Sequence, residues 1–365
     1  MTMRGVAAAL CLVFIVGSGP RLRAEERPPI QIFFGPQSAD TPNGLIRNLL
    51  RFFDSAESTL DGAIHEVDLI LVAQRLVDRS KAGVRVRLVV EADWWNNEKN
   101  TAARKLLQTG GVTIIPDTRK SGLMHNKFFI ADRKRVWTGS TNMTETCLLV
   151  NPNNSLWLES RELAANYEAI FDAYRDGKFG KRAVGKWDNP HPVVMLGDAE
   201  VTTLFSPKDD PLPKIVAEID RAKRSIDVMV FVFSSQEVGE AILRAHRRGV
   251  AVRVLLDNQY ASDGITRRWP FVPFREFRKV GIAVKFDDED AKLHHKVILI
   301  DGITTLTGSF NFSLSAADTN DENMLVIRSQ SITATYQREF ERLWKLYPGT
   351  PGNAPTPERG DGDSP

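Results

Sequence analysis

The sequence predicts an α/β protein built from two tandem α/β domains, each a mixed β-sheet flanked by helices. Three observations support this prediction. The chain has 365 residues, more than a single hydrophobic core usually spans. Its two halves repeat one pattern of segments. Within each half, predicted strands alternate with predicted helices, which is typical of layered α/β domains.

The repeat is visible in matched segments of the two halves. Three pairs of segments correspond: 82–93 with 248–259, 53–64 with 219–230, and 110–115 with 280–286. The offset between equivalent positions stays between 166 and 170 residues. A nearly constant offset indicates a tandem duplication with few insertions.

The order of elements is the same in both halves. Helical spacing of apolar residues at 46–56 and 213–223 predicts an early helix in each half. The stretches 84–90 and 250–256 are rich in β-branched residues and predict buried strands. Each half therefore reads as helix, strand, helix, strand and then further strands.

The boundaries follow from composition. Residues 176–198 are rich in glycine, proline and charge, which predicts a linker. Residues 348–365 cannot bury a core, so we expect a disordered tail there. The two predicted domains span 30–175 and 199–347.

The first 24 residues differ from the rest of the chain. Arg4 precedes the apolar run 5–17, and small and polar residues then lead to Ala24. This pattern predicts a signal peptide at 1–24 and hence an exported protein, periplasmic or secreted. Because Leu22 stands where a small residue is usual, an uncleaved anchor is the alternative. No other stretch predicts a membrane-spanning helix.

Charge and cysteine content limit the function classes. Loss of residues 1–24 removes three arginines and no acids, which lowers the formal charge from +2 to −1. A near-neutral chain lacks the basic character of a tight nucleic-acid binder, although a local basic groove is still compatible with it. Only Cys147 would remain, so we expect no disulfide within the mature chain.

Two otherwise apolar segments carry the same polar residues at the same spacing. LMHNKFFIAD in the first half and KLHHKVILID in the second each keep a histidine, a lysine two residues later and an aspartate five residues after that. Because side chains alternate between the faces of a strand, the histidine and lysine of each segment point the same way. These pairs are His125 with Lys127 and His294 with Lys296.

The aspartates, Asp132 and Asp301, fall where the chain is predicted to turn back on itself, so we assign them a structural role. The returning strand brings a serine beside each histidine, and an asparagine follows on the same patch. These residues are Ser140 and Asn142 in the first half, and Ser309 and Asn311 in the second.

The pattern HxKxxxxD, followed seven residues later by GSxN, resembles the signature of the phospholipase D superfamily. Both copies are complete and include Gly139 and Gly308 before the serines. Two matches in register with an internal repeat are a specific signal. The resemblance implies that the halves join about a pseudo-twofold axis with both histidines in one site. The second half resembles the small bacterial endonuclease branch most.

The resemblance also implies a chemistry without metal or cofactor. One neutral imidazole attacks phosphorus and forms a phosphohistidine. The other, protonated, donates to the leaving oxygen and later activates water. The two lysines, with the serines and asparagines, neutralise the non-bridging oxygens. The sequence contains no HExxH or CxxC motif, so no motif predicts a metal site.

One difference between the halves bears on the roles of the histidines. Glu322 stands 28 residues after His294, and Asn153 stands 28 residues after His125. In the family's small endonuclease a glutamate at this place pairs with the histidine, so we expect Glu322 to orient His294 and Asn153 to orient His125. Family precedent favours His125 as nucleophile. A carboxylate behind His294 favours the opposite assignment, because it raises imidazole basicity.

Other residues receive ordinary interpretations. His65, His191 and His246 are read as structural, His295 faces away from the patch, and Cys147 is read as a small buried residue. Two aromatic loops, Trp94–Trp95 and 267–274, follow equivalent strands. They are either packing residues or the mouth of a site for an amphipathic substrate.

We therefore predict a monomeric, exported, metal-independent phosphodiesterase. The predicted substrate is a phospholipid, hydrolysed to phosphatidic acid and free head group or transferred to an alcohol, with peripheral contact to a lipid surface. An exported endonuclease acting on nucleic acid is the first alternative. A non-catalytic binding module is the second, and two intact motifs count against it.

Overall fold

The structure is a computed structural model, and it describes residues 28–36, 44–183, 189–261, 273–287 and 291–347. The predicted signal peptide, the predicted tail and most of the second aromatic loop lie outside the described residues. Within the described ranges, no helix is long and apolar enough to cross a membrane.

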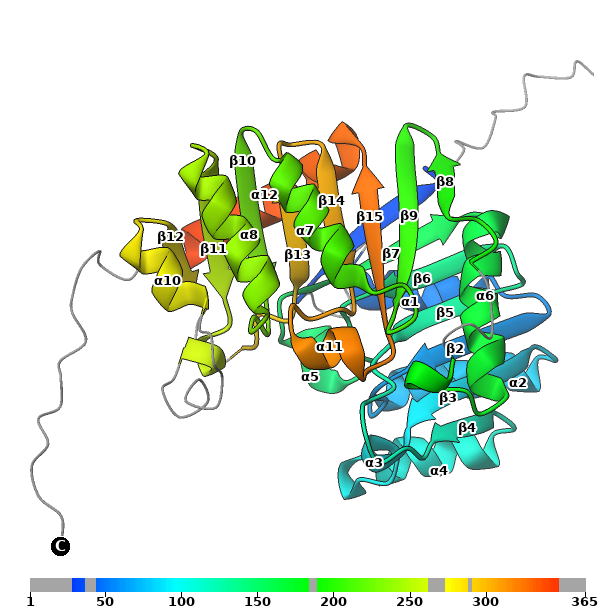
Figure 1. The fold of residues 1–365 in the computed structure, drawn as a ribbon. Helices are drawn as coiled ribbons and strands as arrows, with labels where there is room; N and C mark the ends of the chain where they lie inside the picture. The colour runs from blue at the N-terminus through cyan, green and yellow to red at the C-terminus, as the bar shows by residue number, and fades with distance from the viewer. Residues whose placement is uncertain (1–27, 37–43, 184–188, 262–272, 288–290, 348–365) are drawn as a thin grey trace, which may run out of the picture.

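The first half is a seven-stranded mixed sheet in the order β1-β7-β6-β5-β2-β3-β4 (Figure 1). The pairs β2–β3 and β3–β4 are parallel, and the remaining neighbours are antiparallel. The strands are β1 (Ile30–Gly35), β2 (Thr59–Ile64), β3 (Arg85–Glu91), β4 (Thr113–Asp117), β5 (Lys127–Ala131), β6 (Arg135–Gly139) and β7 (Asn153–Glu159). The helices are α1 (Leu45–Asp54), α2 (Ile70–Lys81), α3 (Ala92–Trp95), α4 (Thr101–Thr109), α5 (Glu145–Leu149) and α6 (Arg161–Arg175).

The second half repeats this plan with one more strand, in the order β12-β11-β10-β13-β14-β15-β9-β8. The strands are β8 (Val193–Leu196), β9 (Ala199–Ser206), β10 (Ser225–Val230), β11 (Ala251–Leu256), β12 (Ala283–Phe286), β13 (Lys296–Ile300), β14 (Thr304–Gly308) and β15 (Glu322–Arg328). The helices are α7 (Pro211–Arg221), α8 (Gln236–Arg247), α10 (Pro273–Lys279), α11 (Leu314–Asp318) and α12 (Gln330–Leu346). The predicted α/β class is confirmed.

Equivalent sequence signals form equivalent elements. The helix α1 buries one apolar face that includes Leu45, Leu49 and Phe52, and α7 occupies the same place in the second half. The long helices α6 and α12 each begin at a serine cap. Ser160 Oγ accepts from the backbone N–H of Leu163, and Ser329 Oγ accepts from that of Ile332.

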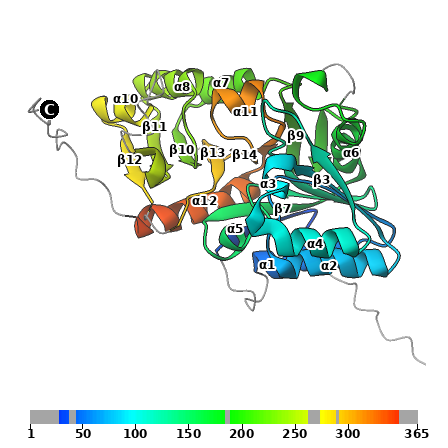
Figure 2. The same ribbon diagram turned by 90° about the horizontal axis from the view of Figure 1, so that it is seen from below.

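Helices cover both faces of each sheet. In the second half, α7 and α8 lie on one face and α12 on the other (Figure 2). The helices α6 and α12 contribute to one hydrophobic core that contains residues of both halves, including Tyr167, Phe205 and Tyr336. The rings of Tyr167 and Phe205 pack edge to face at 5.1 Å across the two halves. The two domains therefore share a core.

The predicted helices and strands of each half are present, with two differences. Each half opens with a strand, β1 or β9, that the predicted order lacks. The stretch 176–198, predicted as a linker, contains the short strand β8, which pairs antiparallel with β9 at the sheet edge. A stretch of four residues is too short for its periodicity to predict a strand. The extended structure of β8 comes from its pairing with the longer β9.

Candidate functional site

The two histidine segments meet where the halves join. The backbone N–H of His125 donates to the carbonyl of Asp321 at 3.0 Å, and that of His294 donates to the carbonyl of Pro152 at 2.7 Å. Each histidine lies two residues before β5 or β13 and is thus held by the loop that precedes β15 or β7 of the other half. Both histidine side chains are buried. The site is assembled from both copies of the repeat.

His125 has a carboxylate partner from the other half. Its Nδ1 lies 2.8 Å from Oε2 of Glu322, and Ser309 Oγ donates to the same oxygen at 2.7 Å. The sequence prediction that Glu322 orients His294 is therefore wrong. The cause is the crossed docking of the halves, because Asp321, next to Glu322, pairs with the segment before His125.

His294 is oriented by a backbone carbonyl. Its Nδ1 donates to the carbonyl oxygen of Ser140 at 2.9 Å, and Cys147 Sγ lies 3.8 Å from the same nitrogen. The side chain of Asn153 accepts from Thr141 Oγ1 and donates to the carbonyl of Cys147. Its polar atoms are used within its own half, so the predicted role of Asn153 in orienting His125 is not observed.

The two lysines occupy equivalent buried positions. Lys127 Nζ donates to the carbonyl of His125 at 2.7 Å, and Lys296 Nζ donates to that of His294 at 2.9 Å. Burial lowers the pKa of Lys127 to about 8. Burial, together with the charge on Lys127, lowers the pKa of Lys296 to about 7. Among the residues that the structure describes, neither Nζ forms a salt bridge, and the charge on Lys127 acts on Lys296; two such ammonium groups favour an anionic ligand.

The imidazoles are neutral in the free site. Burial, and then the charge of the lysines, holds the pKa of His125 and of His294 well below the ordinary histidine value. Burial also raises the pKa of Glu322 to about 8, against the opposing charge of Lys127. Because Nδ1 of each ring is engaged, Nε2 of each ring is left for chemistry.

The motif aspartates lie at the turns, away from the histidines. Asp132 and Asp301 each accept three backbone N–H groups from the loop before the neighbouring strand. The donors are Glu57, Ser58 and Thr59 for Asp132, and Lys223, Arg224 and Ser225 for Asp301. This arrangement fixes the hairpin ends of β5 and β13 to the sheet.

The motif glycines are required by the backbone. Gly139 and Gly308 have φ angles of +148° and +152°, which side-chain-bearing residues rarely adopt. A Cβ atom at either position would overlap the backbone oxygen of Asn154 or Asn323. The close approach lets the following serines bond the same strand, since Ser140 Oγ accepts from Asn154 N–H at 3.1 Å.

The motif serines and asparagines have different hydrogen-bonding roles. Ser309 Oγ donates to Glu322 and accepts from the backbone N–H of Asn323, whereas Ser140 Oγ accepts from the backbone N–H of Asn154. The asparagines keep spare capacity: within the described part of the chain, the side-chain oxygens of Asn142 and Asn311 have no hydrogen-bond partner. One amide N–H of Asn142 donates to Glu66 Oε2 at 2.9 Å.

The sequence interpretation missed His65. Its ring lies 4.7 Å from the ring of His125, and the ring of Phe231 lies 5.0 Å from that of His294. His65 and Phe231 directly follow the equivalent strands β2 and β10, at the strand ends where α/β sites gather. Their position directly after these strands is the sequence signal that predicts a place in the site for His65 and Phe231. Trp94 stacks on His65 at 6.5 Å, so the first aromatic loop borders the site.

The remaining histidines lie apart from this chemistry. His295 is buried and its Nδ1 lies 3.0 Å from Asn154 Nδ2. His246 Nε2 bonds the carbonyl of Val280, and the backbone of His191 bonds Asn166. Over the described ranges, no group of three or more histidine, cysteine or acidic side chains is arranged to hold a metal.

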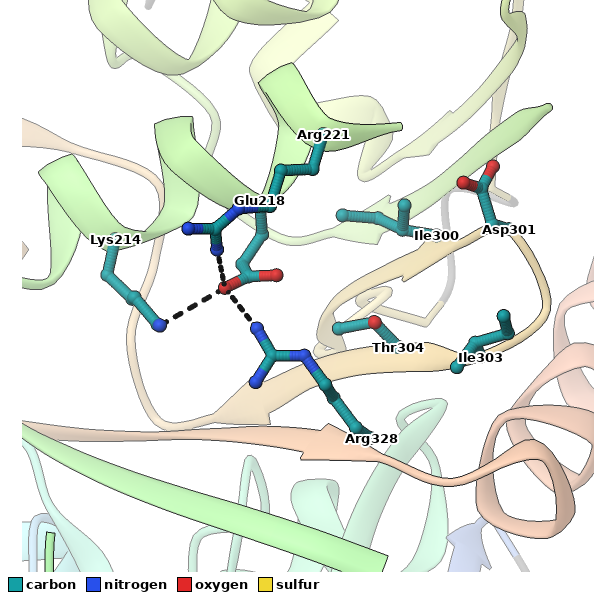
Figure 3. A pocket seen from close by; sticks show the side chains of 8 residues that line it. All are labelled: Lys214, Glu218, Arg221, Ile300, Asp301, Ile303, Thr304 and Arg328. Atoms are coloured by element: carbon teal, nitrogen blue, oxygen red, sulfur yellow. Dashed lines mark hydrogen bonds and ion pairs between the residues drawn. The ribbon is translucent and has the colours of Figure 1, made fainter. Parts of the chain in front are cut away.

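A separate pocket of about 440 Å³ lies at the turn end of β13, opposite the end that carries His294 (Figure 3). Its cations Lys214, Arg221 and Arg328 all contact one oxygen of the buried Glu218, at 3.2, 2.9 and 2.7 Å. The other lining residues are Ile300, Asp301, Ile303 and Thr304. Shared by three cations, Glu218 forms a structural ion cluster that joins α7 to β15.

Both halves match one protein family. The family model described as "Cardiolipin synthase, PLD-like domain" matches residues 49–175 and again 215–344. Mitochondrial cardiolipin hydrolase of Xenopus tropicalis is 38% identical over 139 residues, which is 38% of this chain and 63% of the relative. Phospholipase D of Rickettsia prowazekii (strain Madrid E) is 32% identical over 155 residues, 42% of this chain and 73% of the relative.

The matched region spans a little under two thirds of the Xenopus cardiolipin hydrolase. Among solved structures, the phosphatidylserine synthase of Haemophilus influenzae Rd KW20 superposes with a TM-score of 0.65 at 15% identity. The superposition covers 83% of this chain and 85% of that one. At this identity the likeness shows a shared fold alone.

Proposed function

The chain belongs to the phospholipase D-like family whose model matches both of its halves, and on that premise we propose that it hydrolyses a phospholipid to phosphatidic acid and a free head group. The observation that carries the proposal is the pairing of His125 and His294, each with Nδ1 engaged, beside the buried Lys127 and Lys296. This set supplies a nucleophile, an acid and positive charge to one phosphodiester.

In the first step Nε2 of His125 attacks phosphorus. An N–P bond forms, the bond from phosphorus to the head-group oxygen breaks, and His294 gives its proton to that oxygen. The positive charge that develops on the imidazole lies next to Glu322, 2.8 Å from Nδ1, and favours the ionised form of this carboxyl, whose pKa in the free site is about 8. The pairing thus favours His125 as nucleophile, in agreement with family precedent.

In the second step His294 takes a proton from water, which attacks phosphorus and releases His125. An alcohol in place of water gives transfer instead of hydrolysis. His294 must therefore be protonated before the first step. Burial and then the lysine charges lower the pKa of His294. A bound phosphate anion offsets the lysine charges, so protonation accompanies substrate binding.

Two features favour a lipid as substrate. The relatives include proteins named cardiolipin hydrolase and phospholipase D. Exposed apolar side chains also lie on the segments that flank the site, namely Leu123, Leu149, Val150 and Leu314. Such side chains suit peripheral contact with a lipid surface. Export to the periplasm or medium belongs to the same proposal and rests on the sequence of residues 1–24.

The test is incubation of the purified protein with phospholipid vesicles and, separately, with plasmid DNA, followed by mass spectrometry and gel analysis. We expect phosphatidic acid from the vesicles, and phosphatidylethanol when ethanol is added. The doubly substituted variant His125→Asn, His294→Asn is the control for contaminating activity. Cleaved DNA with intact lipid would replace the lipid proposal with an endonuclease.

A further inference from the structure

The two sides of the site differ where the repeat would make them alike. Glu66 and Val232 are counterparts that follow β2 and β10. The backbone of Met143 donates to the carbonyl of Glu66 at 3.0 Å, and the backbone of Phe312 donates to that of Val232 at 3.2 Å. One side of the site therefore presents a carboxylate where the other presents an aliphatic side chain.

Glu66 is placed beside the reacting groups by contacts on both of its oxygens. Oε1 lies 3.2 Å from Nδ1 of His65, whose ring packs against His125. Oε2 accepts from Asn142 Nδ2 at 2.9 Å. Asn142 belongs to the loop whose Ser140 carbonyl orients His294. The carboxylate is thus tied to the surroundings of both histidines.

Glu66 carries a negative charge. Burial opposes its ionisation, but the contact with His65 and the charges of Lys127 and Lys292 outweigh burial and lower its pKa. Its side chain is 19% exposed, so solvent and ligands reach it. A carboxylate accepts about four hydrogen bonds, and His65 and Asn142 account for two contacts.

A fixed carboxylate next to a phosphate site repels the substrate unless the substrate brings a compensating group. We propose that Glu66 binds the hydrogen-bond donors of the head group, so that the enzyme selects phospholipids whose head-group alcohol carries a hydroxyl or ammonium group. This inference rests on the proposed phospholipid hydrolysis.

The alternative is that Glu66 only holds Asn142 in place. Substitutions separate the two roles. Glu66→Gln keeps an oxygen that accepts from Asn142 but removes the charge, whereas Glu66→Val installs the residue that the repeat uses at position 232. Glu145→Gln removes an exposed acid at the start of α5 and serves as the matched control.

The experiment measures kcat/KM for phosphatidylglycerol and for phosphatidylpropanol in identical mixed micelles. These lipids carry the same charge and differ only in the head-group hydroxyls. We expect the wild-type protein to favour phosphatidylglycerol roughly 10- to 100-fold, as a charge-assisted hydrogen bond allows. Glu66→Val should reduce that ratio to near one, Glu66→Gln should reduce it partly, and Glu145→Gln should keep it.

Two results would overturn the inference while leaving the proposed function intact. One is a wild-type ratio near one. The other is an equal loss on both lipids in Glu66→Val with normal kinetics in Glu66→Gln, which is the outcome for a purely positioning role. Hydrolysis of neither lipid by the folded wild-type protein would instead remove the proposed function itself. Circular dichroism of each variant checks folding.

Discussion

Oε2 of Glu322 lies 2.8 Å from Nδ1 of His125, although the two residues belong to different copies of the repeat. His294 is likewise oriented across the junction, by the carbonyl of Ser140. Neither half therefore holds an oriented histidine without the other. The different partners, a carboxylate and a carbonyl, make the two imidazoles chemically unequal at the centre of a nearly symmetric fold.

The first prediction tests this inequality. Glu322→Gln should lower kcat by about 100-fold or more. With a pKa of about 8, Glu322 can ionise as positive charge develops on His125, whereas an amide cannot ionise. Asn153→Ala, at the equivalent position of the first half, should change kcat by only a few fold, since Asn153 bonds neither histidine. Steady-state rates of both folded variants make the comparison. An equal loss of kcat in the two variants would mean that Glu322 supports the structure of the site and has no specific effect on His125.

The second prediction concerns the motif glycines. Gly308→Ala should lower the free energy of unfolding by about 3 kcal/mol or more, because the added Cβ meets the backbone at a disfavoured φ. Gly302→Ala places a Cβ in open space at a φ of +70°, so the expected loss is about 1 kcal/mol. Urea denaturation of both variants measures the difference. Similar losses of unfolding free energy in the two variants would show that the overlap with the backbone of Asn323 does not destabilise Gly308→Ala.

The sequence predicted which residues enter the site better than which residues touch. The repeat and the spacing of His125 and Lys127 follow from local periodicity, which a single chain displays. The partner of Glu322 depends on how the two halves dock, and docking is set by side chains far apart in sequence. The analogy with a family member that has a single half therefore predicted His294, and not His125, as the partner of Glu322.

Two further misses have the same origin. His65 is a single histidine after a strand, and only the folded chain shows that its ring meets that of His125. The strand β8 has four residues and gains its order from pairing with β9. In both cases the information lies in contacts between segments, not in the composition of either segment.

The third prediction is a pH dependence. The pKa of Lys296 is lowered to about 7, so its charge is present below pH 7 and is lost as the pH rises. For an anionic p-nitrophenyl diester, whose leaving group needs little protonation by His294, kcat/KM should therefore fall between about pH 7 and 9, because this ratio reports the free enzyme. Lys296→Arg should extend activity to higher pH, since guanidinium stays charged. An exposed control, Lys181→Arg, should leave the profile unchanged. A flat wild-type profile would contradict the lowered pKa.

The fourth prediction concerns chelation. The positive charge beside the two histidines comes from Lys127 and Lys296, so hydrolysis should continue in EDTA at undiminished rate. The measurement is the initial rate with and without chelator on the same vesicles. Loss of activity that zinc, magnesium or calcium restores would exclude the mechanism proposed above.

The last prediction separates nucleophile from acid. His294→Asn should still react with a diester of p-nitrophenol, because this leaving group needs little protonation. A phosphohistidine should then accumulate at residue 125, since the base that activates water is missing. His125→Asn should be inactive toward every diester, because no leaving group replaces a missing nucleophile.

Acid-free quenching, proteolysis and mass spectrometry locate the adduct. With the wild-type protein and the same p-nitrophenyl diester, a transient adduct at residue 125 is expected. An adduct at residue 294 would reverse the roles: the carbonyl-oriented imidazole would attack, and Glu322 would support His125 as the proton donor. Since Glu322 contacts His125 alone of the two histidines, Glu322→Gln should slow adduct formation if His125 attacks. If His125 instead activates water, the same variant should slow adduct breakdown, so the two kinetic phases decide the assignment.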